Sequence, residues 1–341
     1  MSEFKLTTVE EFEAATARLL ETGAKVGADS WQMRVKNQTP HCKFGEQGVC
    51  CRICSMGPCR ITPKAPRGIC GCDVHGIVGR NFLRFTAGGA ATHSDHGREI
   101  CITLGHAKEG GDYQVKDPEK LIRIAKEWGV ETEGKDIYDL AHEMSDLAQE
   151  EYGKIRGVSR WLKRAPQHTQ DLWHAAGIEP RAIDREVSCA LHMTHMGNTS
   201  KPEALIRQAL RNGLSDGWGG SMCGTEFSDV LFGTPKPIDT EANLGVMNAE
   251  NVNIVVHGHD PSLSEMICEY ADSKEMIDYA KSMGAKGITV SGVCCTSNEV
   301  AMRRGIPMAG NFLQQENVVL TGACEAIVVD VQCIFPALGP L

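Results

Sequence analysis

The sequence has no long apolar run, no clusters of positive charge and no secretory leader. Nothing in its 341 residues approaches the roughly eighteen uninterrupted apolar residues of a membrane-spanning helix, so no span is expected. The net charge of −9 argues against nucleic acid as a partner, because a phosphate-binding surface needs clustered lysine and arginine. Fifteen cysteines without a leader imply a reducing, anaerobic cytoplasm. Together these features predict a metal-rich intracellular enzyme.

Seven of the fifteen cysteines fall within one stretch, residues 41–72. Cys50 and Cys51 are adjacent, and because neighbouring side chains diverge, the two cannot easily serve the same compact cluster. One natural four-thiolate set for a 4Fe–4S cluster consists of Cys51, Cys54, Cys59 and Cys70. Cys42 and Cys50 remain as half a set, which a second copy of the chain completes most simply across a two-fold axis.

Two other uses of these cysteines are open. Closely spaced cysteines also hold structural zinc. Disulfides are typical of small secreted domains, but this chain is too long to need such cross-links and has no leader. The vicinal pair, followed by eight further cysteines beyond residue 72, favours iron–sulfur clusters.

The first two thirds of the chain predict helices. Residues 1–30 predict a helix that Thr7 caps and that ends near Gly23. Asp117 and Pro118 open another helix, and the same pattern recurs over residues 136–152 and 201–212. Glycines and prolines in residues 219–237 predict a linker or a packed loop.

After about residue 245 the pattern changes to strands. Residues 253–256, 287–293 and 326–331 predict three strands, and Ser262 and Thr296 are predicted to open the helices after the first two. Strand–turn–helix units in series predict a parallel sheet with crossover helices.

The expected fold is therefore α + α/β. A helical iron–sulfur domain, residues 1–240 with the loop 42–72, precedes a Rossmann-like domain at residues 241–341. The chain stops eight residues after Cys333 with no helix to cover the last strand. We therefore expect this domain to be truncated and completed by further protein or a bound partner.

Soft metal ligands follow each predicted strand. They are His257 or His259 after the first strand, Cys294 or Cys295 after the second, and Cys333 after the third. Buried cysteine is also common in α/β cores as a small hydrophobe. Since ligands gather at the carboxyl ends of parallel strands, three successive ends with soft ligands favour a transition-metal or iron–sulfur site.

Several motifs occur in order between residues 42 and 336. They are CKFGEQGVCCRICSMGPCRI, RGICG, AATHSDHG, TEFSDVLFGTPKP, EANLGV, VVHGHDP, GVCCTSNE and VDVQCIFP. This series resembles the anaerobic nickel–iron carbon monoxide dehydrogenases, and it corresponds to the first half or so of such an enzyme. The family fold is a helical domain followed by two Rossmann-like domains.

The resemblance implies ligands for three clusters. Cys42 and Cys50 would supply half of the intersubunit D-cluster, and the four-thiolate set would bind the B-cluster, a 4Fe–4S relay, with Cys72 outside the set. The first protein ligands of the Ni–Fe–S C-cluster would be His259, Cys295 and Cys333, with His257 and Cys294 as near alternatives. The family's remaining ligands and its catalytic lysine lie outside this sequence.

Two histidines match the start of the family's proton relay. His93 and His96 lie three residues apart on a predicted helix and would share one face. Glu99 and Ile102 stand where the relay would continue, so the family's usual proton route is in question. The other interpretation of the two histidines is a structural pair.

The resemblance implies reversible oxidation of CO with water to CO₂, two electrons and two protons. Electrons would leave through the B- and D-clusters of a homodimer to a ferredoxin-like carrier, and attachment to an acetyl-CoA synthase subunit is an open question. Two alternative functions are an electron-transfer or scaffold half without an active site and a hybrid-cluster enzyme that reduces hydroxylamine. Nickel content separates these from the first.

Overall fold

The computed structural model describes residues 9–196 and 198–341, with side chains from residue 14 onward. Contacts divide the chain into two compact units: an α/β unit, residues 1–39 and 235–341, and a helical unit, residues 40–234. The domains expected from the sequence instead placed residues 1–39 with the helical part. No helix in the described part of the chain is long and apolar enough to cross a membrane.

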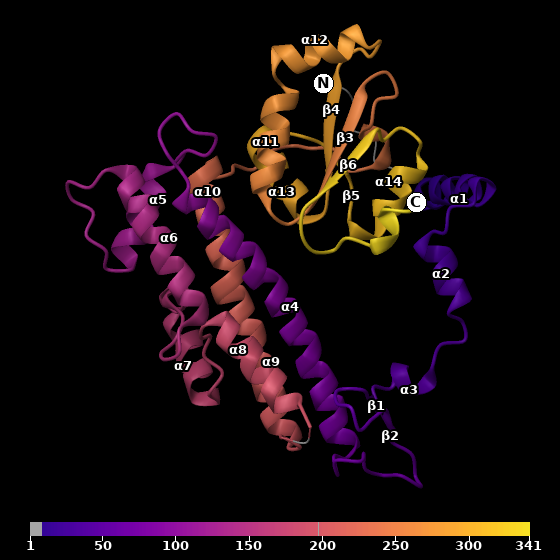
Figure 1. Cartoon of the computed structure of the whole chain (residues 1–341), viewed down its shortest axis with the longest axis vertical. Helices are drawn as coiled ribbons and strands as arrows, with labels where there is room; N and C mark the ends of the chain where they lie inside the picture. Colours follow the sequence, from indigo (N-terminus) through magenta and orange to yellow (C-terminus); the bar gives the residue numbers. More distant parts are fainter. Residues whose placement is uncertain (1–8, 197) are drawn as a thin grey trace. The chain divides into compact units, whose positions relative to one another are not determined.

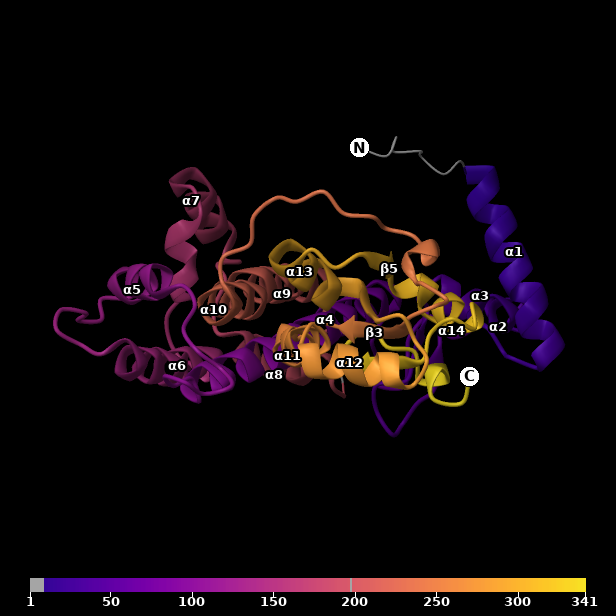
Figure 2. The ribbon, with the colours of Figure 1, turned by 90° about the horizontal axis from the view of Figure 1, so that it is seen from above.

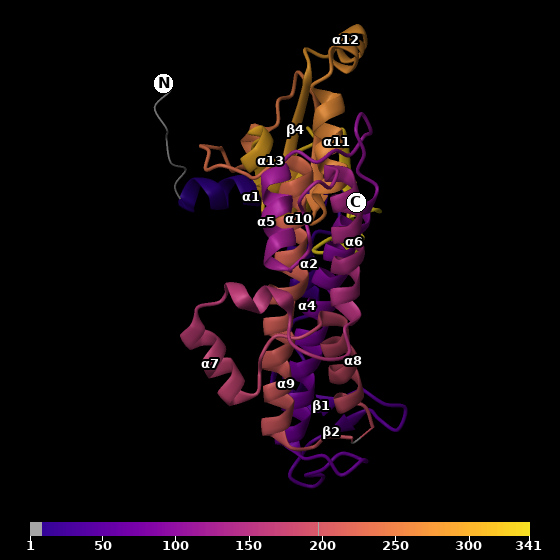
Figure 3. The ribbon, with the colours of Figure 1, turned by 90° about the vertical axis from the view of Figure 1, so that its left-hand side faces the viewer.

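The helical unit is built around α4 (Val74–Gly105), against which α6, α8, α9 and α10 pack (Figure 1). Asp73 opens this helix by accepting a hydrogen bond from the backbone N–H of Gly76. Figure 3 shows α7 standing to one side of α9. The other elements of the unit are α3 (Lys43–Glu46), β1 (Cys50–Cys51), β2 (Cys59–Arg60), α5 (Pro118–Glu127), α6 (Ile137–Gly153), α7 (Gln167–Ala176), α8 (Ile183–Thr194), α9 (Pro202–Ser215) and α10 (Met222–Phe232), with short helical turns at Arg160–Arg164 and Asp216–Ser221.

The predicted helix starts of this unit are confirmed. Asp117 accepts a hydrogen bond from the backbone of Lys120, and Pro118 is the first residue of α5. Asp136 caps α6 in the same way. The end predicted for α9 is wrong, because the helix continues through Gly213 to Ser215. A glycine inside a helix costs only about 1 kcal/mol, which packing of the buried face offsets.

The interpretation of residues 219–237 as a loop is wrong for most of its length. Residues 216–221 form a π-helical turn that runs directly into α10. The Phe227 side chain is fully buried and contacts the rings of Trp128 and Trp161 edge to face. Gly220 serves close packing, because a Cβ at this position would lie 2.8 Å from the carbonyl oxygen of His93. Tertiary packing overrides the low helix propensity of this segment.

Gly97 offers a direct test of the packing around α4. A methyl group there would lie 2.0 Å from the hydroxyl of Tyr152 and 2.7 Å from the carbonyl oxygen of Gly220, both in buried surroundings. We expect Gly97→Ala to lower the free energy of unfolding by about 2–3 kcal/mol, because core overpacking forces backbone shifts. Denaturant unfolding followed by circular dichroism measures the change.

Gly89 of the same helix is the matched control. Nothing lies within 4 Å of a Cβ at that position. Gly89→Ala should therefore raise stability by up to about 1 kcal/mol through helix propensity alone. Equal effects of the two substitutions would contradict the tight contact at Gly97.

The α/β unit contains a four-stranded parallel sheet in the order β5-β4-β3-β6. The three predicted strands are confirmed as β3 (Val252–Gly258), β4 (Ile288–Val293) and β6 (Ala326–Val329). The sequence analysis missed β5 (Met308–Gly310), a short strand at the sheet edge. The register pairs His257 with Val293 on one side and with Val329 on the other, so three strands end together.

The helices of this unit differ in detail from the prediction. Asp260, not Ser262, caps α11 (Pro261–Ala271), and α13 (Cys294–Arg304) begins at Cys294 rather than at Thr296. The remaining elements are α1 (Val9–Val26), α2 (Trp31–Asn37), α12 (Lys274–Ser282) and α14 (Gln315–Leu320), with short helical turns at Leu244–Val246, Phe312–Gln314 and Pro336–Leu338.

The first helix packs against α14 (Figure 2). It continues past Gly23, the predicted end, to Val26. A Cβ at Gly23 would lie 3.0 Å from the side chain of Leu320, so the glycine allows α1 to approach α14. The predicted cap, Thr7, lies outside the described residues.

Candidate metal centres

The cysteine loop of the helical unit forms a pocket lined by sulfur. Its two short strands pair antiparallel, with Cys50 opposite Arg60 and Cys51 opposite Cys59. The pocket is walled by apolar side chains and lined by Cys51, Cys54, Cys59, Cys70 and Cys72. The four members of the predicted thiolate set therefore face one space. Cys72, which the sequence analysis left out, lines the same space and is buried.

Hydrogen bonds in this pocket favour thiolates. The buried guanidinium of Arg80 lies 3.6 Å from the sulfur of Cys70, and the backbone N–H of Ile69 lies 3.4 Å from the sulfur of Cys59. Burial raises the pKa of Cys70, but hydrogen bonds from the Cys72 backbone and from Arg80 outweigh it, so the net pKa is lowered. A soft set of sulfur donors of this kind fits an iron–sulfur cluster.

Cys42 and Cys50 lie apart from the residues that line the pocket. The amide of Asn81 on α4 donates 3.0 Å hydrogen bonds to the carbonyl oxygens of Gly48 and Cys50, which fixes the loop just before Cys51. Cys42 is exposed, and hydrogen bonds from the backbone of Gly45 and Phe44 lower the pKa of its thiol. Of the vicinal pair, Cys51 lines the pocket, whereas Cys50 is half-buried and is not part of its lining.

A second group of ligands lies at the carboxyl edge of the sheet in the α/β unit. Donor atoms of His259, Cys294 and Cys333 all lie within 4.8 Å of one another. Each follows a different strand: β3, β4 or β6. The edge predicted from the order of strands and ligands is therefore the one at which these donors meet.

The backbone at this edge adopts conformations that non-glycine residues rarely take. Cys294 has φ +72°, Gln332 has φ +69° and Cys333 has φ +57°. Such left-handed residues cost about 1–3 kcal/mol each and persist only where the surroundings hold them. Strain concentrated on two sulfur donors is typical of a site shaped for function.

The structure brings Cys294 rather than Cys295 into the donor group. Cys295 is exposed and follows Cys294 on the first turn of α13. A hydrogen bond with Cys295, burial and the nearby Cys333 hold the pKa of Cys294 well above its usual value. The sulfur of Cys294 therefore lies close to those of both Cys295 and Cys333.

His257 has a different environment from His259. It is fully buried, and its Nε2 lies 3.1 Å from the side-chain oxygen of Gln315. Burial lowers the pKa of His257, while this hydrogen bond opposes the shift. His259, not His257, belongs to the donor group.

Asp330 is a residue of this edge that sequence reasoning missed. Its carboxylate accepts hydrogen bonds from the backbone N–H groups of His259 and Val331. Burial raises the pKa of Asp330 to about 6, against the effect of these hydrogen bonds. Gly258 has φ +137°, and a Cβ there would overlap the Asp330 carboxylate at 1.8 Å. The glycine thus lets Asp330 hold the turn that carries His259.

The two candidate relay histidines lie on α4 in the helical unit. His93 Nδ1 is 2.5 Å from a carboxylate oxygen of Asp216, and the His96 side chain is buried. Glu99 and Ile102 are exposed. On α4, the two positions that differ from the family's relay, Glu99 and Ile102, therefore face solvent, whereas His96 is buried.

Comparison with known proteins identifies the family. The model for the Prismane/CO dehydrogenase family matches residues 49–341. The chain belongs to this family. It is 48% identical over 334 residues to carbon monoxide dehydrogenase 1 of Methanosarcina mazei, covering 96% of this chain and 53% of that protein.

Two further relatives extend the comparison. The beta subunit of carbon monoxide dehydrogenase/acetyl-CoA synthase of Moorella thermoacetica is 42% identical over 310 residues, covering 89% of this chain and 46% of the relative. Nickel-free carbon monoxide dehydrogenase from Thermococcus sp. AM4 superimposes with a TM-score of 0.90 at 48% identity, covering 94% of this chain and 52% of that structure. The chain spans about half the length of the carbon monoxide dehydrogenases it matches.

Proposed function

We propose that the protein containing this chain oxidises CO reversibly: CO and water give CO₂, two protons and two electrons. The observation that carries the proposal is the convergence of His259, Cys294 and Cys333 at one edge of the sheet. One imidazole and two thiols form a soft donor set, which suits nickel and iron rather than magnesium or calcium. Membership of the Prismane/CO dehydrogenase family supports the same chemistry.

The residues of this edge would hold one side of a Ni–Fe–S cluster. When bound, that cluster supplies a soft metal for CO and a Lewis acid for water. His259 and Cys333 are ligands in this proposal, and one sulfur of the Cys294–Cys295 pair is the third. The sequence analysis favoured Cys295, whereas the donor geometry favours Cys294. Asp330 orients His259 through its backbone.

Electrons would leave through the sulfur-lined pocket of the helical unit. Cys51, Cys54, Cys59 and Cys70 would hold a 4Fe–4S cluster there, and the N–H donors that face Cys59 and Cys70 would stabilise its negative charge. From this relay, electrons would pass to the D-cluster and then to a ferredoxin-like carrier.

A second copy of the chain is the partner that the exposed face of α4 fits. Val78, Phe82 and Phe85 follow one another at helical spacing and are exposed, Phe85 by 80%. A Cβ at Gly48, next to the Cys50 loop, would lie 3.9 Å from Val78, so this apolar stripe borders the loop that carries Cys42 and Cys50. A homodimer would cover the stripe and complete a cluster shared between subunits.

The histidines of α4 would handle protons. Asp216 orients the ring of His93 through a 2.5 Å contact with its Nδ1. His96, one turn further along, would extend the route, and Glu99 and Ile102 are exposed where the family's relay would continue. A partner of the acetyl-CoA synthase type is a further candidate, because the Moorella relative carries that description.

Anaerobic metal analysis tests the proposal. Nickel together with roughly ten irons per chain is expected if all three clusters are present. The protein should also reduce a viologen dye under CO. Iron near five or six per chain without nickel would instead favour an electron-transfer half, and hydroxylamine reduction without nickel would favour a hybrid-cluster enzyme.

A further inference from the structure

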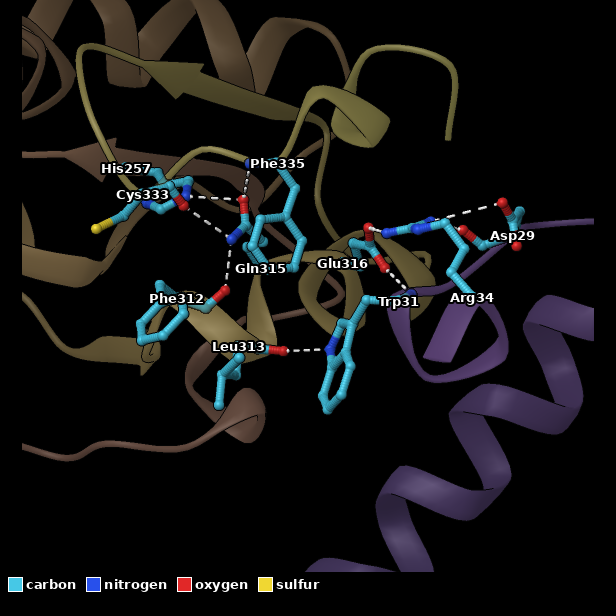
Figure 4. A network of polar contacts seen from close by, with 10 residues as sticks. All are labelled: Asp29, Trp31, Arg34, His257, Phe312, Leu313, Gln315, Glu316, Cys333 and Phe335. Carbon is cyan, nitrogen blue, oxygen red and sulfur yellow. Dashed lines mark hydrogen bonds and ion pairs between the residues drawn. The ribbon is translucent and has the colours of Figure 1, made fainter. Parts of the chain in front are cut away.

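Gln315 lies at the start of α14, and its fully buried side chain makes four hydrogen bonds (Figure 4). Its Nε2 donates to the carbonyl oxygens of Phe312 and Cys333, the latter at 2.9 Å. Its Oε1 accepts from the backbone N–H of Phe335 at 2.8 Å and lies 3.1 Å from Nε2 of His257. A single amide thus joins β3, α14 and the loop that carries Cys333.

The partners of this amide fix its orientation and the tautomer of His257. Carbonyl oxygens only accept and a backbone N–H only donates, so the Gln315 nitrogen must face Phe312 and Cys333. The oxygen then faces His257, whose Nε2 must carry the hydrogen. With its hydrogen on Nε2 and that N–H facing the amide, His257 cannot bind a metal through Nε2.

The loop beyond β6 needs such support. Gln332 and Cys333 both have left-handed backbone conformations, at φ +69° and +57°. Gln315 holds the loop at this turn by hydrogen bonds to the carbonyl oxygen of Cys333 and to the N–H of Phe335. The Phe335 ring also contacts the ring of Phe312 edge to face, with centroids 6.5 Å apart.

The neighbouring residue, Glu316, anchors the same turn of α14 on its other side. Its buried carboxylate accepts the backbone N–H of Trp31 and pairs with the guanidinium of Arg34 on α2. The indole N–H of Trp31 donates to the carbonyl oxygen of Leu313 at 2.7 Å. Figure 4 shows these contacts as one line from α2 to the Cys333 loop.

We infer that Gln315 is a positioning residue for the candidate metal centre in the α/β unit. It holds the Cys333 loop in its left-handed turn and fixes the ring of His257 with its Nε2–H facing the amide. Glu316 ties this support to the N-terminal segment through Trp31 and Arg34. The inference rests on the proposed function for the presence of a metal at this site. The hydrogen bonds that hold the loop do not depend on that proposal.

The test compares the same substitution at two adjacent residues. Gln315→Glu keeps the side-chain shape and an acceptor for Phe335, but removes both N–H donors. Gln314→Glu is the matched control, because Gln314 uses only its oxygen, as acceptor from Asn311. Gln315→Met removes the same N–H donors without adding a charge, so it separates the loss of these donors from any misfolding that a buried carboxylate causes. Nickel and iron per chain are measured after anaerobic purification, and hydrogen–deuterium exchange of residues 330–338 is measured in the metal-free chain.

We expect both Gln315 variants to lose nickel about tenfold, as is usual when support of a metal ligand is removed. Iron in the helical unit should stay unchanged, exchange in residues 330–338 should rise several-fold, and Gln314→Glu should behave as wild type. Wild-type nickel and exchange in Gln315→Met would overturn the inference, as would a loss of nickel that is accompanied by loss of the iron of the helical unit. If the wild-type protein holds no nickel, the proposed function fails, while the exchange measurement still decides whether Gln315 holds the loop.

Arg34→Gln tests the link to the N-terminal segment without altering α14. It leaves the carboxylate of Glu316 buried without its ion pair. We expect faster exchange in residues 312–320 and a smaller loss of nickel than in the Gln315 variants. Unchanged exchange in residues 312–320 would overturn this part of the inference.

Discussion

Cys333→Ala is expected to abolish nickel binding and CO oxidation while leaving the iron of the sulfur-lined pocket in place. The thiol of Cys333 is one of three donors that converge within 4.8 Å at the sheet edge. Loss of supporting residues around a metal lowers affinity or activity about 10–100-fold, so loss of a direct ligand should cost at least that. Nickel and iron analysis, combined with viologen reduction under CO, measures both effects.

Cys324 provides the matched control. It precedes β6 at the opposite end of the strand, is half-buried, and its sulfur contacts the carbonyl oxygen of Ala326 at 3.4 Å. Cys324→Ala should cost about 1 kcal/mol of stability or less and leave nickel unchanged. Full nickel content in Cys333→Ala, or equal losses in the two variants, would contradict the assignment of Cys333 as a ligand.

Much of the sheet edge could be predicted from the sequence, because it depends on local patterns. Short runs rich in β-branched residues identified β3, β4 and β6, and parallel topology then required their carboxyl ends to meet. The pattern could not reveal β5, since three residues, Met308–Gly310, are too few for a periodicity. The loop predicted over α10 failed for a related reason: Gly220 and Gly224 reflect close packing against α4, which is a long-range property.

The choice of ligands within the site lay beyond the sequence. His257 and His259 both follow an apolar run, and only the tertiary structure, which places His259 and not His257 in the donor group, distinguishes them. The same holds for Asp330, which reaches His259 across the sheet edge from another strand. The VDVQC motif placed a carboxylate three residues before Cys333, but its partner is set by tertiary structure.

Cys50→Ala should remove the cluster shared between subunits and spare the B-cluster. Cys51 lines the sulfur pocket, whereas Cys50 belongs to the loop segment outside it, next to the apolar stripe of α4. Iron should fall by roughly two per chain, half of one four-iron cluster. The dimer should weaken, because it loses a metal link that both copies complete. Anaerobic iron analysis, electron paramagnetic resonance and sedimentation velocity measure these changes.

Cys54→Ala is the reciprocal variant, because Cys54 lies in the pocket and not at the proposed interface. It should remove the B-cluster signal and leave a dimer with its shared cluster. If Cys50→Ala keeps both clusters, the division of the vicinal pair is wrong. If it loses both clusters, the two sites depend on one loop. The hydrogen bonds from Asn81 to the carbonyl oxygens of Gly48 and Cys50 would then link the occupancy of one cluster to that of the other. The two variants together therefore decide whether adjacent cysteines can serve independent clusters.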